Sequence, residues 1–151
     1  MEDKKDYIFK YNLKDAWFED FYEIKIYDKD IDNVVINDFD DDDEDVVCKV
    51  FTLSRDGIEN IKSLLTEELL TLSSESLEFP MVLDGCMNRF TLIKGDKENI
   101  LYGDNLWAFE KDNYKDDKHP NADKVIKLFY DVKEILDRER IDTRHLSLDI
   151  D

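Results

Sequence analysis

The sequence predicts an α+β fold, in which a mainly antiparallel sheet of five to seven strands carries two amphipathic helices on one face. Several segments show the two-residue alternation of half-buried strands, and turn signals join neighbouring strands into hairpins. Two further segments repeat apolar residues at helical spacing. Because hairpins outnumber βαβ crossovers, the strands should pair antiparallel and the helices should share one face.

The chain begins with two predicted strands, Tyr7–Leu13 and Trp17–Tyr27. In the second strand, Tyr22, Ile24 and Ile26 fall on one face, and charged residues alternate with them. This pattern is typical of a strand that buries one side against a core.

The segment from Asp28 to Asp45 interrupts this order with ten acidic residues against a single base, Lys29. The short apolar stretch Val34–Ile36 within it is predicted to be an edge strand between two acidic loops. The strand pattern resumes at Val46–Leu53.

The first helix is predicted to start after Ser54, which is a typical N-cap residue. Leu53 and Ile58 occupy the positions of a hydrophobic staple around this cap. The apolar spacing continues to Leu72, which predicts one amphipathic helix ending near Ser73-Ser74. A stripe of this width normally faces the sheet of its own domain.

Hairpins are expected to follow, and a second amphipathic helix should open at Pro120-Asn121. The predicted strands of this half are Phe79–Leu83, Asn88–Ile93, Asn99–Tyr102, a short one at Trp107–Phe109 and a last one or a frayed end at His145–Leu148. Asp84-Gly85 and Gly95-Asp96 supply the turn signals.

The size of the chain predicts one domain over residues 1–151, with an acidic loop region at 28–45. Apolar residues make up 42% of it, which is enough for a core without disulfides. Cys48 and Cys86 lie in strand-like surroundings and are expected to be reduced and buried. No long apolar run or basic leader is apparent, so a cytoplasmic location is expected.

The net charge of −18 limits the partners. Nucleic-acid phosphates and anionic membranes are normally bound through Lys and Arg, and both would repel this chain. We therefore expect neither direct nucleic-acid binding nor membrane binding. The alternative interpretation of the charge is that it serves solubility alone.

Enzymatic activity is not expected. His119 precedes a proline in a charged loop and His145 lies near the last residue, and neither has a recognisable nucleophile beside it. Glu23-Ile24-Lys25 resembles the Glu-x-Lys triplet of metal-dependent nucleases. The spacing from Asp15 or Asp20 leaves no room for the hairpin that such a site requires. The cysteines form no zinc motif, and no cofactor is expected.

A calcium loop is a separate possibility, because hard cations prefer oxygen ligands. Asp28, Asp30 and Asp32 match the first, third and fifth positions of an EF-hand loop. Asn33 then replaces the required glycine and Phe39 the bidentate glutamate. A weak calcium or magnesium module stays open as an alternative, whereas a dedicated calcium switch is not supported.

The acidic run is the main candidate for a binding function. Extended residues rise about 3.3 Å each, and one DNA strand carries a charge per ~3.4 Å of axis, so a basic groove built for phosphates could accept this run. Tight binding also requires desolvated anchors, which are usually aromatic. The candidate partner-binding residues are Asp38, Asp40, Asp41, Asp42, Asp43, Glu44 and Asp45, with Asp28, Asp30 and Asp32 alongside and Tyr102 and Trp107 as anchors.

Three segments give the C-terminal half a resemblance to a known class: Phe79–Gly85, Tyr102–Asn105, and the helix that opens at Pro120-Asn121. They resemble the small α+β immunity proteins of bacterial contact-dependent and polymorphic toxin systems. The resemblance implies a non-enzymatic protein that blocks a basic nuclease toxin by direct binding. A phage-type inhibitor that mimics nucleic acid to block a host defence enzyme is the alternative.

Overall fold

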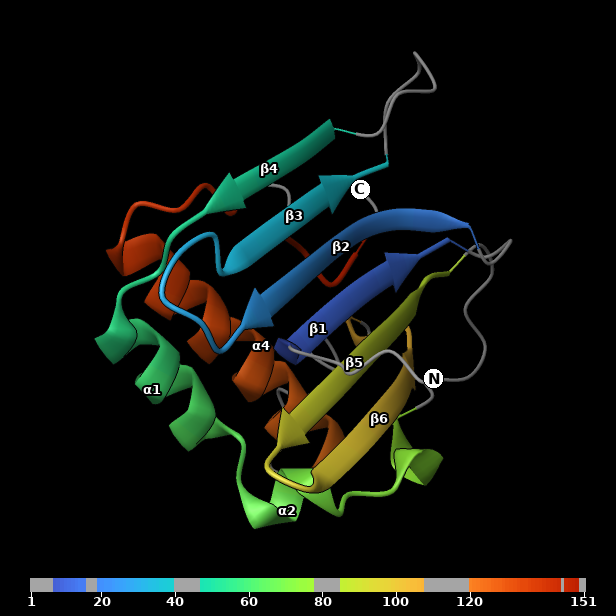
Figure 1. Cartoon of the computed structure of the whole chain (residues 1–151). Helices are drawn as coiled ribbons and strands as arrows, with labels where there is room; N and C mark the ends of the chain where they lie inside the picture. The colour runs from blue at the N-terminus through green and yellow to red at the C-terminus, as the bar shows by residue number, and fades with distance from the viewer. Residues whose placement is uncertain are drawn as a thin grey trace, which may run out of the picture.

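The computed structural model describes residues 7–15, 19–39, 47–77, 85–107, 120–144 and 146–149. In these ranges six antiparallel strands form one sheet, and the helices α1 (Arg55–Leu64) and α4 (Pro120–Arg138) lie on one of its faces (Figure 1). The α+β class predicted from the sequence is therefore confirmed. In the described part of the chain, no helix combines the length and apolar character needed to cross a membrane.

The strands are ordered β4-β3-β2-β1-β5-β6 across the sheet. Their bounds are β1 Tyr7–Lys14, β2 Asp20–Tyr27, β3 Val34–Asp38, β4 Val47–Phe51, β5 Met87–Lys94 and β6 Lys97–Asp104. Every described pair is antiparallel, and β5 and β6 form the hairpin predicted around Gly95-Asp96.

The helix-covered face of the sheet carries the core. Tyr22, Ile24 and Ile26 are all buried there, as their alternation predicts. Ile24 pairs with Ile36 of β3, which in turn pairs with Lys49 of β4. The prediction of an edge strand at Val34–Ile36 is therefore wrong, because β3 lies inside the sheet and β4 forms the edge.

The long helix predicted after Ser54 is divided into two. Helix α1 spans Arg55–Leu64 and the short α2 spans Glu67–Leu70, followed by the 3-10 turn η1 at Ser74–Ser76. The chain leaves the helical conformation at Leu65, and the side chain of Thr66 accepts a hydrogen bond from the N–H of Leu69. A threonine that caps a new helix competes with continuation of the old one.

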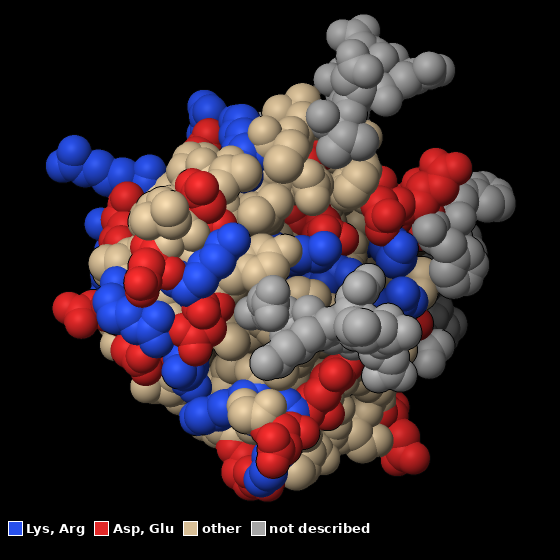
Figure 2. Space-filling model, in the orientation of Figure 1, with Lys and Arg blue, Asp and Glu red and all other residues tan. Residues whose placement is uncertain are grey.

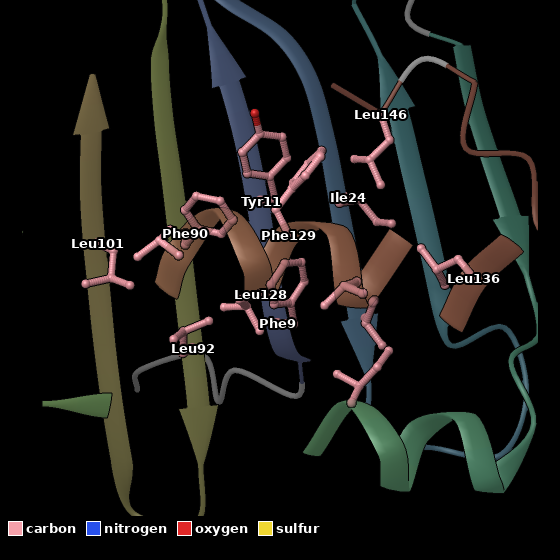
Figure 3. Close-up of a cluster of buried hydrophobic side chains, with 14 of the residues drawn as sticks. Phe9, Tyr11, Ile24, Phe90, Leu92, Leu101, Leu128, Phe129, Leu136 and Leu146 are labelled. Atoms are coloured by element: carbon pink, nitrogen blue, oxygen red, sulfur yellow. The ribbon is translucent and has the colours of Figure 1, made fainter. Parts of the chain in front are cut away.

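Helix α4 spans Pro120–Arg138, begins at the predicted proline and crosses behind the sheet (Figure 1). Its buried side chains meet those of the central strands (Figure 3). Phe129 packs edge-on against Tyr11 of β1 with ring centroids 5.1 Å apart. Helix α1 packs beside α4, and its Ile58 and Ile61 are fully buried.

The described residues after α4 close the core without forming a strand. Leu146 and Leu148 are buried, and Cys86 Sγ donates to the carbonyl of Leu148 (3.3 Å). The predicted strand at 145–148 is therefore wrong for the described residues 146–148. Buried polar contacts hold the tail on the sheet, since Tyr11 Oη donates to the carbonyl of Ser147 (2.7 Å).

Two more predictions need correction, and one stays open. Trp107 has a helical backbone instead of the predicted strand, and residues 108–109 lie outside the described ranges. Cys48 is exposed on β4, whereas Cys86 is buried as expected. The predicted strand at 79–83 lies outside the described residues.

Candidate protein-binding surfaces

The acidic run is attached to one end of the β3–β4 pair. β3 ends at Asp38 and β4 begins at Val47, and these two residues are cross-strand partners. The chain therefore leaves the sheet and re-enters it at the same end. The predicted binding residues Asp40, Asp41, Asp42, Asp43, Glu44 and Asp45 lie between these points, outside the described residues.

Asp38 is the one member of the predicted run that the structure describes. It is half-buried and pairs across the strands with Tyr22 of β2. Burial, together with the negative charges of Asp38 and Asp142, raises the pKa of the Tyr22 phenol. Asp38 thus contributes negative potential at the end of the sheet where the run begins.

Asp28, Asp30 and Asp32 lie in the β2–β3 turn, at the opposite end of β3 from the run. The five residues of β3 put about 13 Å, at ~3.3 Å per residue, between this turn and Asp38, where the run begins. The prediction groups these aspartates with the run, but they are attached to the other end of β3.

The turn aspartates also have local cationic partners. Asp28 lies 2.8 Å from Arg55 and 3.2 Å from Lys62, and Asp30 lies 4.0 Å from Arg55. Partial burial raises the pKa of the Asp28 carboxyl, but hydrogen bonds from Lys62 and Arg55 outweigh it and hold the pKa below its usual value. Asp28 thus serves to join the turn to α1.

On the face of the molecule seen in Figure 2, Lys and Arg are interspersed with Asp and Glu. In the described ranges there are 23 acidic and 16 basic residues, which accounts for −7 of the net charge of −18. The larger part of the negative charge is carried by residues outside these ranges, with the six carboxylates at 40–45 as its densest stretch.

The two predicted aromatic anchors differ in exposure. Tyr102 lies on β6 with 51% of its surface exposed, and the guanidinium of Arg89 stacks 4.9 Å from its ring centre. Trp107 is half-buried and packs against the core, so it is poorly placed for a partner. β4, which follows the acidic run, and β6, which carries Tyr102, are the two opposite edges of the sheet, five strand spacings or roughly 24 Å apart.

The residues weighed for catalysis are engaged in structural contacts. Glu23 accepts a hydrogen bond from Asn12 (3.1 Å) and lies 3.6 Å from Lys25 and 3.8 Å from Lys10. Asp20 pairs with Lys14 at 2.7 Å. Glu23 of the Glu-x-Lys triplet and the nearby Asp20 are therefore both paired with lysines of the same or the neighbouring strand.

No group of three or more potential metal-binding side chains occurs among the described residues. His119 and His145 lie outside those ranges. Burial and the charge of Asp149 raise the pKa of the Cys86 thiol to about 12. Cys86 is therefore a packing residue and a poor nucleophile, since the thiolate is the reactive form.

A hollow of about 330 Å³ lies between α1, α2 and α4. Leu64, Leu69 and Leu128 contribute apolar surface to it. Lys124 pairs with Glu68 (2.6 Å) on its lining, so the charges there are balanced. The hollow lies beside the helix break at Leu65, which the uninterrupted apolar spacing of the sequence did not reveal.

A second feature that the sequence did not reveal is the edge strand β4. Val47 and Val50 are 40% and 50% exposed, and Cys48 is exposed beside them. The available signal was that Val47–Phe51 lacks polar residues at alternate positions. That pattern alone cannot tell an exposed edge from a fully buried strand.

The chain matches no family model, and neither a curated protein nor a solved structure is similar enough to match it. The charge, exposure and topology of its own residues therefore carry the evidence for its function.

Proposed function

We propose that this chain is a non-enzymatic binding protein that inhibits a basic protein partner by direct contact, in the manner of an immunity protein that neutralises a nuclease-type toxin. The observation that carries the proposal is the attachment of six consecutive carboxylates to one end of the β3–β4 pair. A nuclease must present cationic groups to phosphates, and a dense row of carboxylates competes for the same groups.

The run would act mainly on the rate of association. A concentrated charge of one sign raises the encounter rate with an oppositely charged site by about 10- to 1,000-fold at low salt. This effect weakens as the Debye length shrinks to about 8 Å at physiological ionic strength. The turn aspartates Asp28 and Asp30 would contribute less, because Arg55 and Lys62 already compensate their charge locally.

The test begins with capture of binding proteins from the source cells at increasing salt, followed by mass spectrometry. The captured protein is purified, and its association with this chain is measured by stopped flow over a range of salt concentrations. Replacing each acid of the run by its amide (Asp→Asn at 40–43 and 45, Glu44→Gln) should slow association about tenfold or more at low salt. The two rates should converge at high salt.

A matched control changes three acids at the other end of β3. The combined Asp28→Asn, Asp30→Asn and Asp32→Asn variant should lower the association rate much less than the variant of the run. Effects in proportion to the number of charges removed, six against three, would show that only total charge matters. Identical association of the run variant and the unaltered protein at low salt would refute the steering role.

A further inference from the structure

The two edges of the sheet differ in whether another segment of the described chain covers them. The β6 edge is covered by the segment that follows α1, because Asp104 N–H donates to the carbonyl of Leu77 (2.9 Å) and Tyr102 N–H to Ser74 Oγ (3.0 Å). Asn99 Nδ2 adds hydrogen bonds to carbonyls of the same segment. On the other side, β3 is the only described neighbour of β4.

The backbone N–H and C=O groups of successive β3 residues point alternately toward β2 and toward β4. This alternation determines which backbone groups of β4 lie at its open edge. Tyr27 N–H donates to the carbonyl of Asn33 (2.7 Å), and Phe39 N–H donates to that of Phe21 (3.1 Å). The odd-numbered residues of this stretch therefore direct their backbone groups toward β2. Since these groups alternate along a strand, the even-numbered residues of β3 direct theirs toward β4.

The register between β3 and β4 shows which residues of β4 bond to β3. The partners of the even-numbered residues are Val47, Lys49 and Phe51, whose backbone groups consequently face β3. The N–H and C=O groups of Cys48 and Val50 then point away from the sheet. They form the open edge that a further strand could pair with.

Exposed apolar side chains gather at this edge. The described residues include five large exposed hydrophobic side chains, and Val47 and Val50 are two of them. A third, Ile31, is 67% exposed in the β2–β3 turn. That turn lies beside the C-terminal end of β4, because Asp32 N–H donates to Thr52 Oγ1 (3.0 Å).

The devices that usually protect an edge strand are weak in β4. It contains no proline, and its single charged residue is Lys49. Lys49 lies on the helix-side face, 3.8 Å from Asp142. Natural edge strands are normally blunted by charges, prolines or bulges, and a flat apolar edge is a template for another strand.

We infer that the β4 edge, formed by the outward backbone groups of Cys48 and Val50, receives an extended basic segment of the protein partner as an added strand. This inference rests on the proposed function and names the contact that would hold the partner after its encounter. Main-chain hydrogen bonds supply affinity in such strand addition, and alternate side chains supply specificity.

The negative charge of this chain favours a basic segment over a second copy of the chain as the added strand. Each copy carries a net charge of −18, and the run ends at Asp45, two residues before Val47. Pairing β4 with β4 of another copy would bring two such charges together, whereas lysine and arginine side chains would be attracted. The added strand should place apolar side chains beside Val50 and basic ones toward the N-terminal end of β4.

Amide exchange followed by NMR tests the inference on the full chain, with a synthetic peptide of alternating lysine and valine as the probe. In the free protein, the amides of Cys48 and Val50 should exchange quickly, while those of Lys49 and Phe51 are slowed by their bonds to β3. Millimolar peptide should slow Cys48 and Val50 by about tenfold or more, with no change at Tyr102 on the covered edge.

The matched control is the same peptide with the amides that would face β4 N-methylated, which keeps its charge but removes the donors. Equal slowing by both peptides, or slowing by neither, would overturn strand addition. Slowing by a peptide with glutamate in place of lysine would overturn the choice of a basic segment. Slowing that rises with protein concentration without peptide would instead identify a second copy as the occupant.

A Val50→Pro variant provides an independent measurement, because it removes one outward N–H and no bond to β3. The peptide should then slow Cys48 at least tenfold less, while a protected Lys49 amide shows that the fold is intact. With the captured partner, salt-dependent association without protection of Cys48 and Val50 would refute this inference and leave the inhibitor proposal standing. Absence of any cationic partner would refute the inhibitor proposal.

Discussion

Replacing Asn33 by alanine should destabilise the protein far more than its small side chain suggests. Asn33 is fully buried between the β2–β3 turn and the segment that joins β4 to α1. Its Nδ2 donates to the carbonyls of Leu53 and Lys29, both at 2.9 Å, and its Oδ1 accepts from Leu53 N–H at 2.6 Å. The side-chain amide of Asn33 thus bonds both backbone groups of Leu53, as a neighbouring strand would, and holds the chain in place just after β4.

The expected loss in the free energy of unfolding can be worked out from the backbone groups that Asn33→Ala would leave without a hydrogen-bond partner. Leu53 is fully buried, so its N–H and C=O would lose hydrogen bonds in a site closed to water. Each buried group left unsatisfied costs about 1–3 kcal/mol, which gives a total of about 2–6 kcal/mol for the pair. The carbonyl of Lys29 lies in an exposed turn and should add little. The whole free energy of unfolding of a small domain is only about 5–15 kcal/mol.

Urea unfolding of the Asn33→Ala variant, followed by tryptophan fluorescence and circular dichroism, measures this loss. The dependence of the free energy of unfolding on urea should be unchanged, so that the shift lies in the midpoint. Asn37→Ala is the matched control, because Asn37 is half-buried on β3 and takes no part in the Leu53 contacts; its effect should stay within about 0.5 kcal/mol. A loss below about 1 kcal/mol for Asn33→Ala would refute the reasoning.

Two further predictions concern the core and the cysteines. Tyr11→Phe keeps the ring against Phe129 but removes the hydroxyl that donates to Ser147 and accepts from Asn88 Nδ2 (2.9 Å). It should lower the free energy of unfolding in urea by about 1–3 kcal/mol, and an unchanged midpoint would contradict the role given to this network. Iodoacetamide at mildly alkaline pH should label exposed Cys48 and spare Cys86, whose pKa is raised to about 12 by burial. Peptide mass spectrometry should find both cysteines labelled in urea. Equal labelling of the two cysteines in the folded protein would contradict the burial of Cys86.

Much of the fold could be predicted because its signals are local. The alternation at Tyr22–Ile26, the turn at Gly95-Asp96 and the apolar spacing after Pro120 each depend on a few neighbouring residues. The break between α1 and α2 was missed because the apolar spacing continues across it. Thr66 followed by two glutamates is an N-terminal signature that could have indicated the second start.

The candidate surfaces were harder to predict because they depend on strand order. Val34–Ile36 and Val47–Phe51 are both short and apolar, and which of them forms the edge is decided by pairing between distant segments. Proximity in sequence also grouped the aspartates at 28–32 with the run at 40–45. The two groups are attached to opposite ends of β3, and in the first of them Asp28 is compensated by Arg55 and Lys62 of α1.

Under the proposed function, the charge of the run and the open edge of β4 explain each other. An apolar edge such as Val47–Phe51 invites self-association, and the usual remedy is to blunt the strand itself. Here the like charge of every copy opposes that pairing at long range and leaves the backbone groups of Cys48 and Val50 available. The same field attracts a cationic segment, so one charge distribution would exclude the wrong strand and admit the right one. Blunting β4 with a proline would protect against self-association equally well, but it would also abolish the contact that holds the partner.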